Sequence, residues 1–466
     1  MRLEVERNSV VTSSIRGARM SSFIARSAGS AALAATLLAL AGCGATYRPV
    51  VSAINPVGPA TQTTKYAVAV SDRGNGAAGL LTIVDVFGDT LLVNADLGTY
   101  PSYFALGSSG SDGYVLHCQR DATGTPVTGK CNDTIDAFSV SPTLMTNAIQ
   151  HTSLIVGSNP ISAVANASFL YAAQPGSSTV SSSTIGQPPA FRQQLPTGLN
   201  PIYVVVFPSS SASTNANRLY ALAQGATPGV STGTATAIES STNTISNTIT
   251  VGRNPVYGIM NVDGRRAFVV NKTDGTVSVI NTQTNALDIT SALPAATIAV
   301  GANPVWADLA NNINEMVVLN AGDGTTAGSL SILSIPLCSS ITAVGDVNCD
   351  TANPIDAVGF GTVLGTVPVG VNPVMVTVLQ DVNKAYIANQ NGTVTVVDLT
   401  TLKATKTITV GGTLNWIVAT SGTPTGKVYV TASDTQNLTI INTNTDTITT
   451  TIPLLGTGVA VRVTAQ

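Results

Sequence analysis

The sequence predicts an all-β fold in which four-stranded antiparallel sheets repeat around a closed ring. Three observations lead to this fold class. The chain of 466 residues is 44% hydrophobic but only 10% charged, so it can bury a core yet lacks the charges for long amphipathic helices. One short phrase recurs along the chain, and four runs typical of β-strands lie between its copies.

The recurring phrase places a glycine shortly before a proline and separates one repeat from the next. Clear copies are VGSNP (156–160), PTGLNP (196–201), VGRNP (251–255), VGANP (300–304) and VGVNP (369–373). Weaker copies are LGTYP (97–101), VGGTLNW (410–416) and LGTGV (455–459). Successive glycines of the phrase lie 41 to 69 residues apart, and a basic period near 41–45 with insertions indicates a β-propeller or a related repeat array.

The strands are clearest in the repeat that runs from Gly370 to Gly411. It contains four β-runs, at 373–379, 384–389, 393–399 and 403–410. Asn391-Gly392 lies between the second and third runs and is a strong hairpin signal. Four strands in a repeat of this length make one blade of a propeller.

The two ends of the chain predict how the ring closes. Three strands precede the first glycine of the phrase, at 66–71, 80–86 and 90–97, and one strand follows the last, at 459–464. The C-terminal strand is therefore expected to pair with the N-terminal three, which removes open sheet edges. This arrangement predicts eight blades over residues 66–466, with seven as the alternative if one weak copy is not a full blade.

Turn residues within each repeat have local roles. The glycine of the phrase is expected to adopt a positive φ, and the proline to fix the start of the next inner strand. Four polar residues end third strands and are expected to cap the following turns: Asp85, Asn281, Asp398 and Asn442.

Three segments resemble the YVTN-repeat family: AFVVNKTDGTVSVINTQTN (267–285), KAYIANQNGTVTVVDLTT (384–401) and KVYVTASDTQNLTIINTNTD (427–446). The resemblance covers most of 66–466 and is strongest in the last four repeats. It implies a β-propeller that is often exported or on the cell surface. It implies no single activity, because some members are surface-layer proteins and similar propellers include lyases and lactonases.

The N-terminal region reads as a targeting signal. Arginines precede an apolar run at 28–42, which suits a signal peptide better than a membrane-spanning helix. The run ends in Leu40-Ala41-Gly42-Cys43, which resembles the lipobox of bacterial lipoproteins and implies lipidation of Cys43. We therefore expect a signal peptide at 1–42, starting at Met1 or Met20, and a lipid-anchored tether at 43–65. Gly44 after the lipidated cysteine implies the outer membrane. The sequence does not decide between its periplasmic and its surface face.

The other four cysteines form two local pairs. An even number of cysteines in an exported protein indicates disulfides, here Cys118–Cys131 and Cys338–Cys349. Neither pair has the spacing of a metal site, so no metal is expected.

Residues that carry catalysis are scarce. The chain has two histidines, His117 and His151, and no nucleophile, metalloprotease or phosphate-binding motif. His151 is expected in an outer strand with a surface or packing role. No cofactor is expected, and the net charge of −3 argues against nucleic acid as a partner.

One aromatic pattern stands out. Two residues after the proline position of the phrase, five of eight repeats carry an aromatic residue: Tyr103, Tyr203, Tyr257, Trp306 and Trp416. The others carry Ser162, Met375 and Val461. The rings are expected to fill the core between blades; the alternative is a ligand-binding collar at the mouth of the central channel, with Asp308 on the same face as Trp306.

Three functions remain open. The leading hypothesis is a lipid-anchored envelope propeller that binds or scaffolds an unidentified envelope protein or glycan without catalysis, its loops at 119–130, 208–217 and 335–363 supplying contacts. The second is a lyase or hydrolase with Asp308 and tyrosines at the channel mouth. The third is a surface-layer or adhesion protein.

Overall fold

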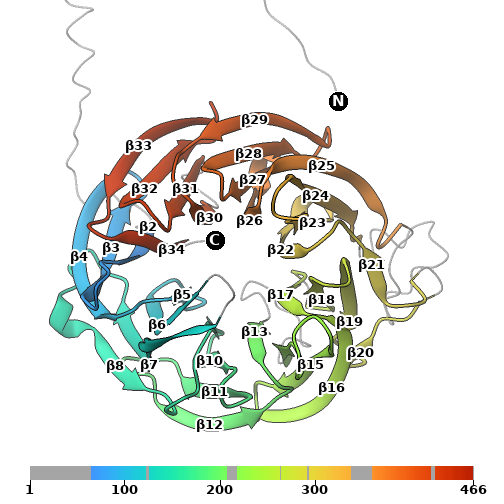
Figure 1. Cartoon of the computed structure of the whole chain (residues 1–466), viewed down its shortest axis with the longest axis horizontal. Helices are drawn as coiled ribbons and strands as arrows, with labels where there is room; N and C mark the ends of the chain where they lie inside the picture. Colours follow the sequence, from blue (N-terminus) through green and yellow to red (C-terminus); the bar gives the residue numbers. More distant parts are fainter. Residues whose placement is uncertain are drawn as a thin grey trace, which may run out of the picture. The chain divides into compact units, whose positions relative to one another are not determined.

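The propeller is an eight-bladed ring of antiparallel sheets. The computed structural model describes residues 65–121, 125–206, 218–262, 264–290, 293–336, 359–420 and 426–464. The described strands form eight sheets, so the eight-blade count is confirmed and the seven-blade alternative is wrong. Figure 1 shows the sheets arranged in a ring around a central axis. No helix within these ranges is long and apolar enough to span a membrane.

Each blade runs from an inner strand beside the channel to an outer strand at the rim. The first four blades, inner strand first, consist of β34 (Thr457–Val463), β2 (Tyr66–Asp72), β3 (Ala78–Asp85) and β4 (Thr90–Thr99); β5 (Tyr103–Leu106), β6 (Asp112–Arg120), β7 (Pro126–Ser139) and β8 (Gln150–Ser153); β9 (Ser162–Ala165), β10 (Phe169–Gln174), β11 (Thr179–Thr184) and β12 (Phe191–Pro196); β13 (Pro201–Val205), β14 (Arg218–Ala223), β15 (Thr232–Glu239) and β16 (Thr244–Arg253).

The other four blades follow the same order, except that the outer edge of the fifth is divided into two short strands. They consist of β17 (Pro255–Met260), β18 (Arg266–Asn271), β19 (Thr276–Asn281), β20 (Ala286–Leu287) and β21 (Thr297–Ala299); β22 (Pro304–Ala310), β23 (Glu315–Asn320), β24 (Ala327–Ser334) and β25 (Val363–Val371); β26 (Pro373–Leu379), β27 (Lys384–Asn389), β28 (Thr393–Asp398) and β29 (Lys403–Thr409); β30 (Leu414–Ala419), β31 (Lys427–Ala432), β32 (Asn437–Asn442) and β33 (Thr447–Pro453). Three short 3-10 turns complete the described elements: η1 (Thr146–Ala148), η2 (Asn311–Ile313) and η3 (Gln380–Val382).

The ring closes as the sequence predicts. Strand β34 pairs antiparallel with β2, with Val461 opposite Ala69. The backbone N–H of Tyr66 also donates to the Thr464 hydroxyl at 2.9 Å. The first blade therefore joins the two ends of the described chain.

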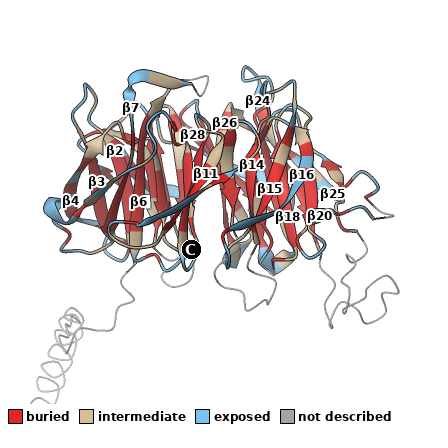
Figure 2. Cartoon of the chain, turned by 90° about the horizontal axis from the view of Figure 1, so that it is seen from below, coloured by how far each residue is buried: buried red, intermediate tan, exposed pale blue. Residues whose placement is uncertain are grey.

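The core lies between blades. The described residues form eight hydrophobic clusters, one at each junction of neighbouring blades, and each combines residues from two sheets. Figure 2 shows the buried residues filling the body of the ring and the exposed ones at its loops and rim. Sheets buried on both faces need few charges, which accounts for the low charge of the chain.

The glycine of the repeated phrase has a different role from the predicted one. In the seventh blade the positive φ of 51° belongs to Asn372, whereas Gly370 lies outside the left-handed region. A Cβ on Gly370 would lie 2.4 Å from Cγ of Asn389, so this residue must be glycine to admit the asparagine side chain. The same contact recurs between Gly252 and Asn271 and between Gly301 and Asn320. The general prediction of a positive φ is therefore wrong here, although it holds at Gly157 and Gly411.

The predicted turn caps are confirmed. The side-chain oxygen of each third-strand residue accepts a backbone N–H two or three residues later; Asp398, for example, accepts from Thr400 at 2.9 Å and from Thr401 at 2.8 Å. Equivalent bonds are made by Asp85, Asn281 and Asn442.

Candidate functional site

A set of five aromatic residues occupies one level of the central channel, near the start of the inner strands. We call Tyr103, Tyr203, Tyr257, Trp306 and Trp416 the aromatic belt. In blade five, Pro255 pairs with Asn271 and Tyr257 pairs with Val270, so Val256 is an extra residue that forms a bulge. The inner strands that carry Tyr203, Trp306 and Trp416 have the same bulge. Bulges of this kind change the direction in which the next side chain points.

The rings of the belt contact one another across the channel. Tyr257 stacks on Trp306 with a centroid distance of 3.9 Å, and Tyr203 lies 4.8 Å from Tyr257. Trp306 in blade six reaches Trp416 in blade eight at 6.2 Å, past blade seven. Trp416 in turn reaches Tyr103 in blade two at 5.9 Å, past blade one. Contacts between blades that are not neighbours mean that the rings converge within the channel.

The belt also takes part in core packing. Trp306 packs against three of the inter-blade clusters, and Trp416 against three. Tyr103, Tyr203, Trp306 and Trp416 nevertheless remain only half-buried, while Tyr257 is buried. The two tryptophans therefore pack between blades, as the first interpretation predicts, and part of the belt surface stays accessible.

Arg462 is a channel residue that the sequence reasoning missed. Strand β34 pairs Gly458 with Ser71 and Ala460 with Val70, so Ala460 occupies the belt position of the first blade. The assignment of Val461 to that position is therefore wrong by one residue. Arg462 then corresponds to Asp308 of blade six, two residues beyond the belt. The weak copy LGTGV, which has no proline, concealed this register.

Arg462 lies against the belt. Its Cζ is 4.8 Å from the ring centroid of Trp416, and its Nη2 donates to the Tyr103 hydroxyl at 3.4 Å. Burial raises the pKa of Tyr103, Tyr203 and Tyr257, and the positive charge of Arg462 lowers each pKa in part. Three tyrosine hydroxyls therefore share the field of one guanidinium group.

Asp308 lies where the sequence predicts, on the channel strand of blade six. Its Oδ1 accepts the backbone N–H of Leu309 at 2.8 Å, and its Oδ2 accepts that of Val378 in blade seven at 2.7 Å. Burial nevertheless raises the pKa of Asp308 from 3.8 to about 6, because these two bonds offset only part of the cost of burying the charge. Asp308 joins two blades and can exchange a proton near neutral pH.

A cavity of about 250 Å³ opens beside the belt, where the inner strands of blades one, two, three and eight begin. Its lining includes Ser102 and Asn415, each of which immediately precedes a belt residue, together with Arg120 and Val459. Polar and apolar side chains both line this cavity, and no belt residue is among them.

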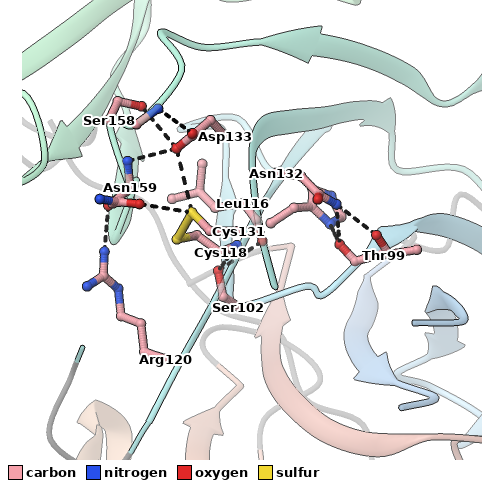
Figure 3. Close-up of a disulfide and its surroundings, with 12 residues drawn as sticks. Thr99, Ser102, Leu116, Cys118, Arg120, Cys131, Asn132, Asp133, Ser158 and Asn159 are labelled. Atoms are coloured by element: carbon pink, nitrogen blue, oxygen red, sulfur yellow. Dashed lines mark hydrogen bonds between the residues drawn. A yellow bond between two sulfur atoms is a disulfide. The ribbon is translucent and has the colours of Figure 1, made fainter. Parts of the chain in front are cut away.

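The predicted Cys118–Cys131 disulfide is present in blade two (Figure 3). The two cysteines are cross-strand partners on β6 and β7, and Cys118 also lines the cavity. Next to it, Asp133 accepts the backbone N–H groups of Gly157 and Asn159, both at 2.7 Å. Cys43, Cys338 and Cys349 lie outside the described residues, as do the loop at 208–217 and most of that at 335–363.

The two histidines share one carboxylate in blade two. The Nε2 of His117 lies 3.0 Å from Oδ2 of Asp136, and the Nδ1 of His151 lies 2.5 Å from Oδ1. Gly98 of the first blade donates its backbone N–H to Asp136 at 2.6 Å. Burial would raise the pKa of Asp136, but the bonds from His117, Gly98 and His151 lower it overall. The group joins blades one and two at a distance from the inner strands, and no sequence motif marks it.

No set of three or more histidine, cysteine, aspartate or glutamate side chains among the described residues is arranged to hold a metal ion.

Comparison with known proteins supports the fold and does not extend to a family. No protein-family model matches the chain, and no curated protein matches its sequence. Among solved structures, apo AztD from Citrobacter koseri is 10% identical, with a TM-score of 0.53, over 86% of this chain and 98% of that one.

Two further structures show the same architecture. The dihydro-heme d1 dehydrogenase NirN in complex with DHE is 10% identical, with a TM-score of 0.59, over 89% of this chain and 78% of that one. A proposed 6-phosphogluconolactonase from Bacteroides fragilis is 14% identical, with a TM-score of 0.50, over 87% and 99%. At these identities the similarity shows the propeller fold alone.

Proposed function

We propose that the chain is a lipid-anchored β-propeller of the bacterial cell envelope that binds a ligand or partner at the mouth of its channel, without catalysis. The observation that carries this proposal is the aromatic belt. Rings from five blades meet in the channel while four of them keep accessible surface. Aromatic side chains at a concave site bind ring-bearing ligands by stacking and by burial of apolar area.

The composition of the inner strands favours binding over catalysis. The eight inner strands, all fully described, contain one carboxylate, Asp308, and one cation, Arg462. General acid–base catalysis commonly requires two groups within hydrogen-bond reach of the reacting atoms. Both oxygens of Asp308 already accept backbone N–H groups, and no ion pair joins it to Arg462 in the described structure.

The proposed location depends on the N-terminal sequence. Leu40-Ala41-Gly42-Cys43 supports lipidation of Cys43, and Gly44 supports the outer membrane. Stable anchoring by several acyl chains would hold the propeller through the tether at 43–65. Within the propeller, β2 begins where β34 ends, whereas the belt lies where the inner strands start. Tyr66, which begins β2, therefore lies at the end of the inner strands away from the belt. The YVTN-like segments support the same exported setting.

Membrane fractionation tests the anchor. The wild-type chain is expected in the membrane fraction with an acylated N-terminal cysteine in its mass spectrum. Cys43→Ser is expected to move the chain to the soluble fraction. Retention of Cys43→Ser in the membrane would contradict lipid anchoring at this residue.

Capture from envelope extracts, together with a glycan panel, tests the binding site. Trp306→Leu and Trp416→Leu are expected to lose the bound partner while remaining folded by circular dichroism. Phe191→Leu is the matched control, because Phe191 is an aromatic residue on the outer strand β12 and is 55% exposed. Unchanged capture by both tryptophan variants, with lowered melting temperatures, would assign the belt to packing alone.

One observation favours an enzyme as the second candidate. A channel carboxylate whose pKa burial raises to about 6 can act as a general acid or base near neutral pH. A lyase or hydrolase would then use Asp308 with the belt tyrosines. Turnover in a substrate screen that Asp308→Asn abolishes, with ligand binding retained, would favour this candidate over pure binding.

A further inference from the structure

Arg462 lies against Trp416 and Tyr103, and two N–H groups there have no hydrogen-bond acceptor among the described residues. Its guanidinium stacks over Trp416 and donates one bond, through Nη2, to the Tyr103 hydroxyl. Its Nε is buried without a hydrogen-bond partner, and so is the indole Nε1 of Trp416. Two donors on touching side chains therefore lack acceptors within the described structure.

Among the described residues, no carboxylate forms an ion pair with Arg462. Four other arginines in the described ranges form ion pairs with carboxylates: Arg73, Arg218, Arg253 and Arg266. Arg462 forms none there. The other charged residue of the inner strands, Asp308, is bound by backbone N–H groups of blades six and seven. A half-buried cation with an unpaired donor is costly, and an anionic ligand removes that cost.

The side chains around Arg462 indicate what the ligand carries besides its anionic group. Trp416 offers ring surface beside the guanidinium, Trp306 lies against Trp416 with a centroid distance of 6.2 Å, and three tyrosine hydroxyls lie within the field of Arg462. Asp308, on the side of Tyr257, disfavours a second negative charge there. This arrangement suits a small molecule with one anionic group and one ring. Arginine and an indole N–H can together donate to both oxygens of a carboxylate.

We propose that the channel binds a ring-bearing carboxylate, with the carboxylate at Arg462 and Trp416 Nε1 and the ring against the aromatic belt. The inference rests on the proposed binding function and names the ligand class. The ring is that of an aromatic acid or of a uronic acid, and the experiment separates these two sources.

Tryptophan fluorescence gives a direct readout. Trp306 and Trp416 are the chain's two tryptophans, so the whole indole signal comes from the belt. The purified full chain is titrated with benzoate and with its neutral isostere benzamide, and separately with galacturonate and galactose. We expect saturable change with at least one acid, and binding about 10-fold or more weaker for its neutral counterpart.

Arg462→Gln is expected to weaken binding of that acid by about 10- to 100-fold. Arg192→Gln is the matched control, because the Arg192 Cζ lies 5.4 Å over the Phe169 ring outside the channel and its loss should leave binding unchanged. Arg462→Lys keeps the charge but not the planar donor pair, and should bind with intermediate strength. The comparison of acid and amide on the wild-type chain needs no variant and holds even if Arg462→Gln folds poorly.

The outcomes separate the two proposals. Equal binding of acid and neutral counterpart would overturn the carboxylate inference and leave ring binding in place. Failure of both acids to bind the folded wild-type chain would also overturn it, while capture that depends on the tryptophans would still support the proposed function. Binding that is unchanged in Arg462→Gln would place the carboxylate elsewhere and contradict the assignment of Arg462.

Discussion

Asp308→Asn should change how the stability of the propeller depends on pH. Asp308 has a folded-state pKa of about 6 against an ordinary value of 3.8, because burial disfavours its charge. Between these two values the unfolded chain releases a proton that the folded chain keeps. The free energy of unfolding therefore falls as pH rises through this window and stays lower above it.

The size of the effect follows from the two pKa values. A shift from 3.8 to about 6 corresponds to about 3 kcal/mol. This figure is an upper bound, because Asp308 is half-buried and solvent in the channel screens its charge. Asparagine cannot ionise, so Asp308→Asn should gain stability relative to wild type by up to that amount from about pH 4 to about pH 7. Loss of one acceptor oxygen adds a constant cost of about 1 kcal/mol at every pH.

Urea unfolding of both chains across this pH range measures the difference directly. Asp434→Asn is the control with the opposite sign, because bonds from the Thr413 backbone N–H and hydroxyl lower the pKa of Asp434. That carboxylate stabilises the fold above its unfolded-state pKa, and the contribution is lost as pH falls. A difference between wild type and Asp308→Asn that does not change with pH would refute the reasoning about the buried charge.

Two further predictions concern the frame of the ring. Replacing Cys118 and Cys131 by serine should lower the free energy of unfolding by about 3 kcal/mol, since the bond closes a loop of 13 residues; urea unfolding under non-reducing conditions measures this, and equal midpoints would contradict it. Gly370→Ala should cost about 1–3 kcal/mol, because its Cβ would lie 2.4 Å from Asn389, and thermal melting should show it. Gly107→Ala is the control, with its nearest contact at 3.5 Å; equal losses in both variants would refute the close-approach explanation.

The repeats made the frame of the propeller predictable from sequence. In blade seven the predicted inner strand at 373–379 coincides with β26, because Pro373 and Leu379 bound a run rich in β-branched and apolar residues. Closure was predictable because three strands at one end and one at the other complete a blade. The Cys118–Cys131 disulfide was predictable because an even number of cysteines falls into two local pairs, each within one repeat.

The channel chemistry was only partly predictable. Counting from the proline placed Trp306 and Asp308 correctly, but the last copy of the phrase has Gly458 where others have proline, and Arg462 was missed. Neither the contact of Trp416 with Trp306 nor that with Tyr103 could be read from the chain, because each joins blades that are not neighbours.

The glycine of the repeated phrase shows that a recurring residue can be required for a reason other than the predicted one. Gly370 was expected to need a positive φ, but it needs room for Asn389, a residue on another strand. Similarly, His117 and His151 meet at Asp136 through cross-strand register, which spacing along the sequence does not reveal.

Collisional quenching of tryptophan fluorescence is the most direct test of an accessible channel lined by the aromatic belt, with the Arg462 cation against Trp416. Both tryptophans lie in the belt, and the Arg462 guanidinium lies against one of them, Trp416, while the whole chain carries a net charge of −3. Iodide should therefore quench more strongly than caesium at equal ionic strength, and Arg462→Gln should remove the difference. Quenching by neither ion, or equal quenching by both in the wild-type chain, would contradict a ligand-accessible belt next to an unpaired cation.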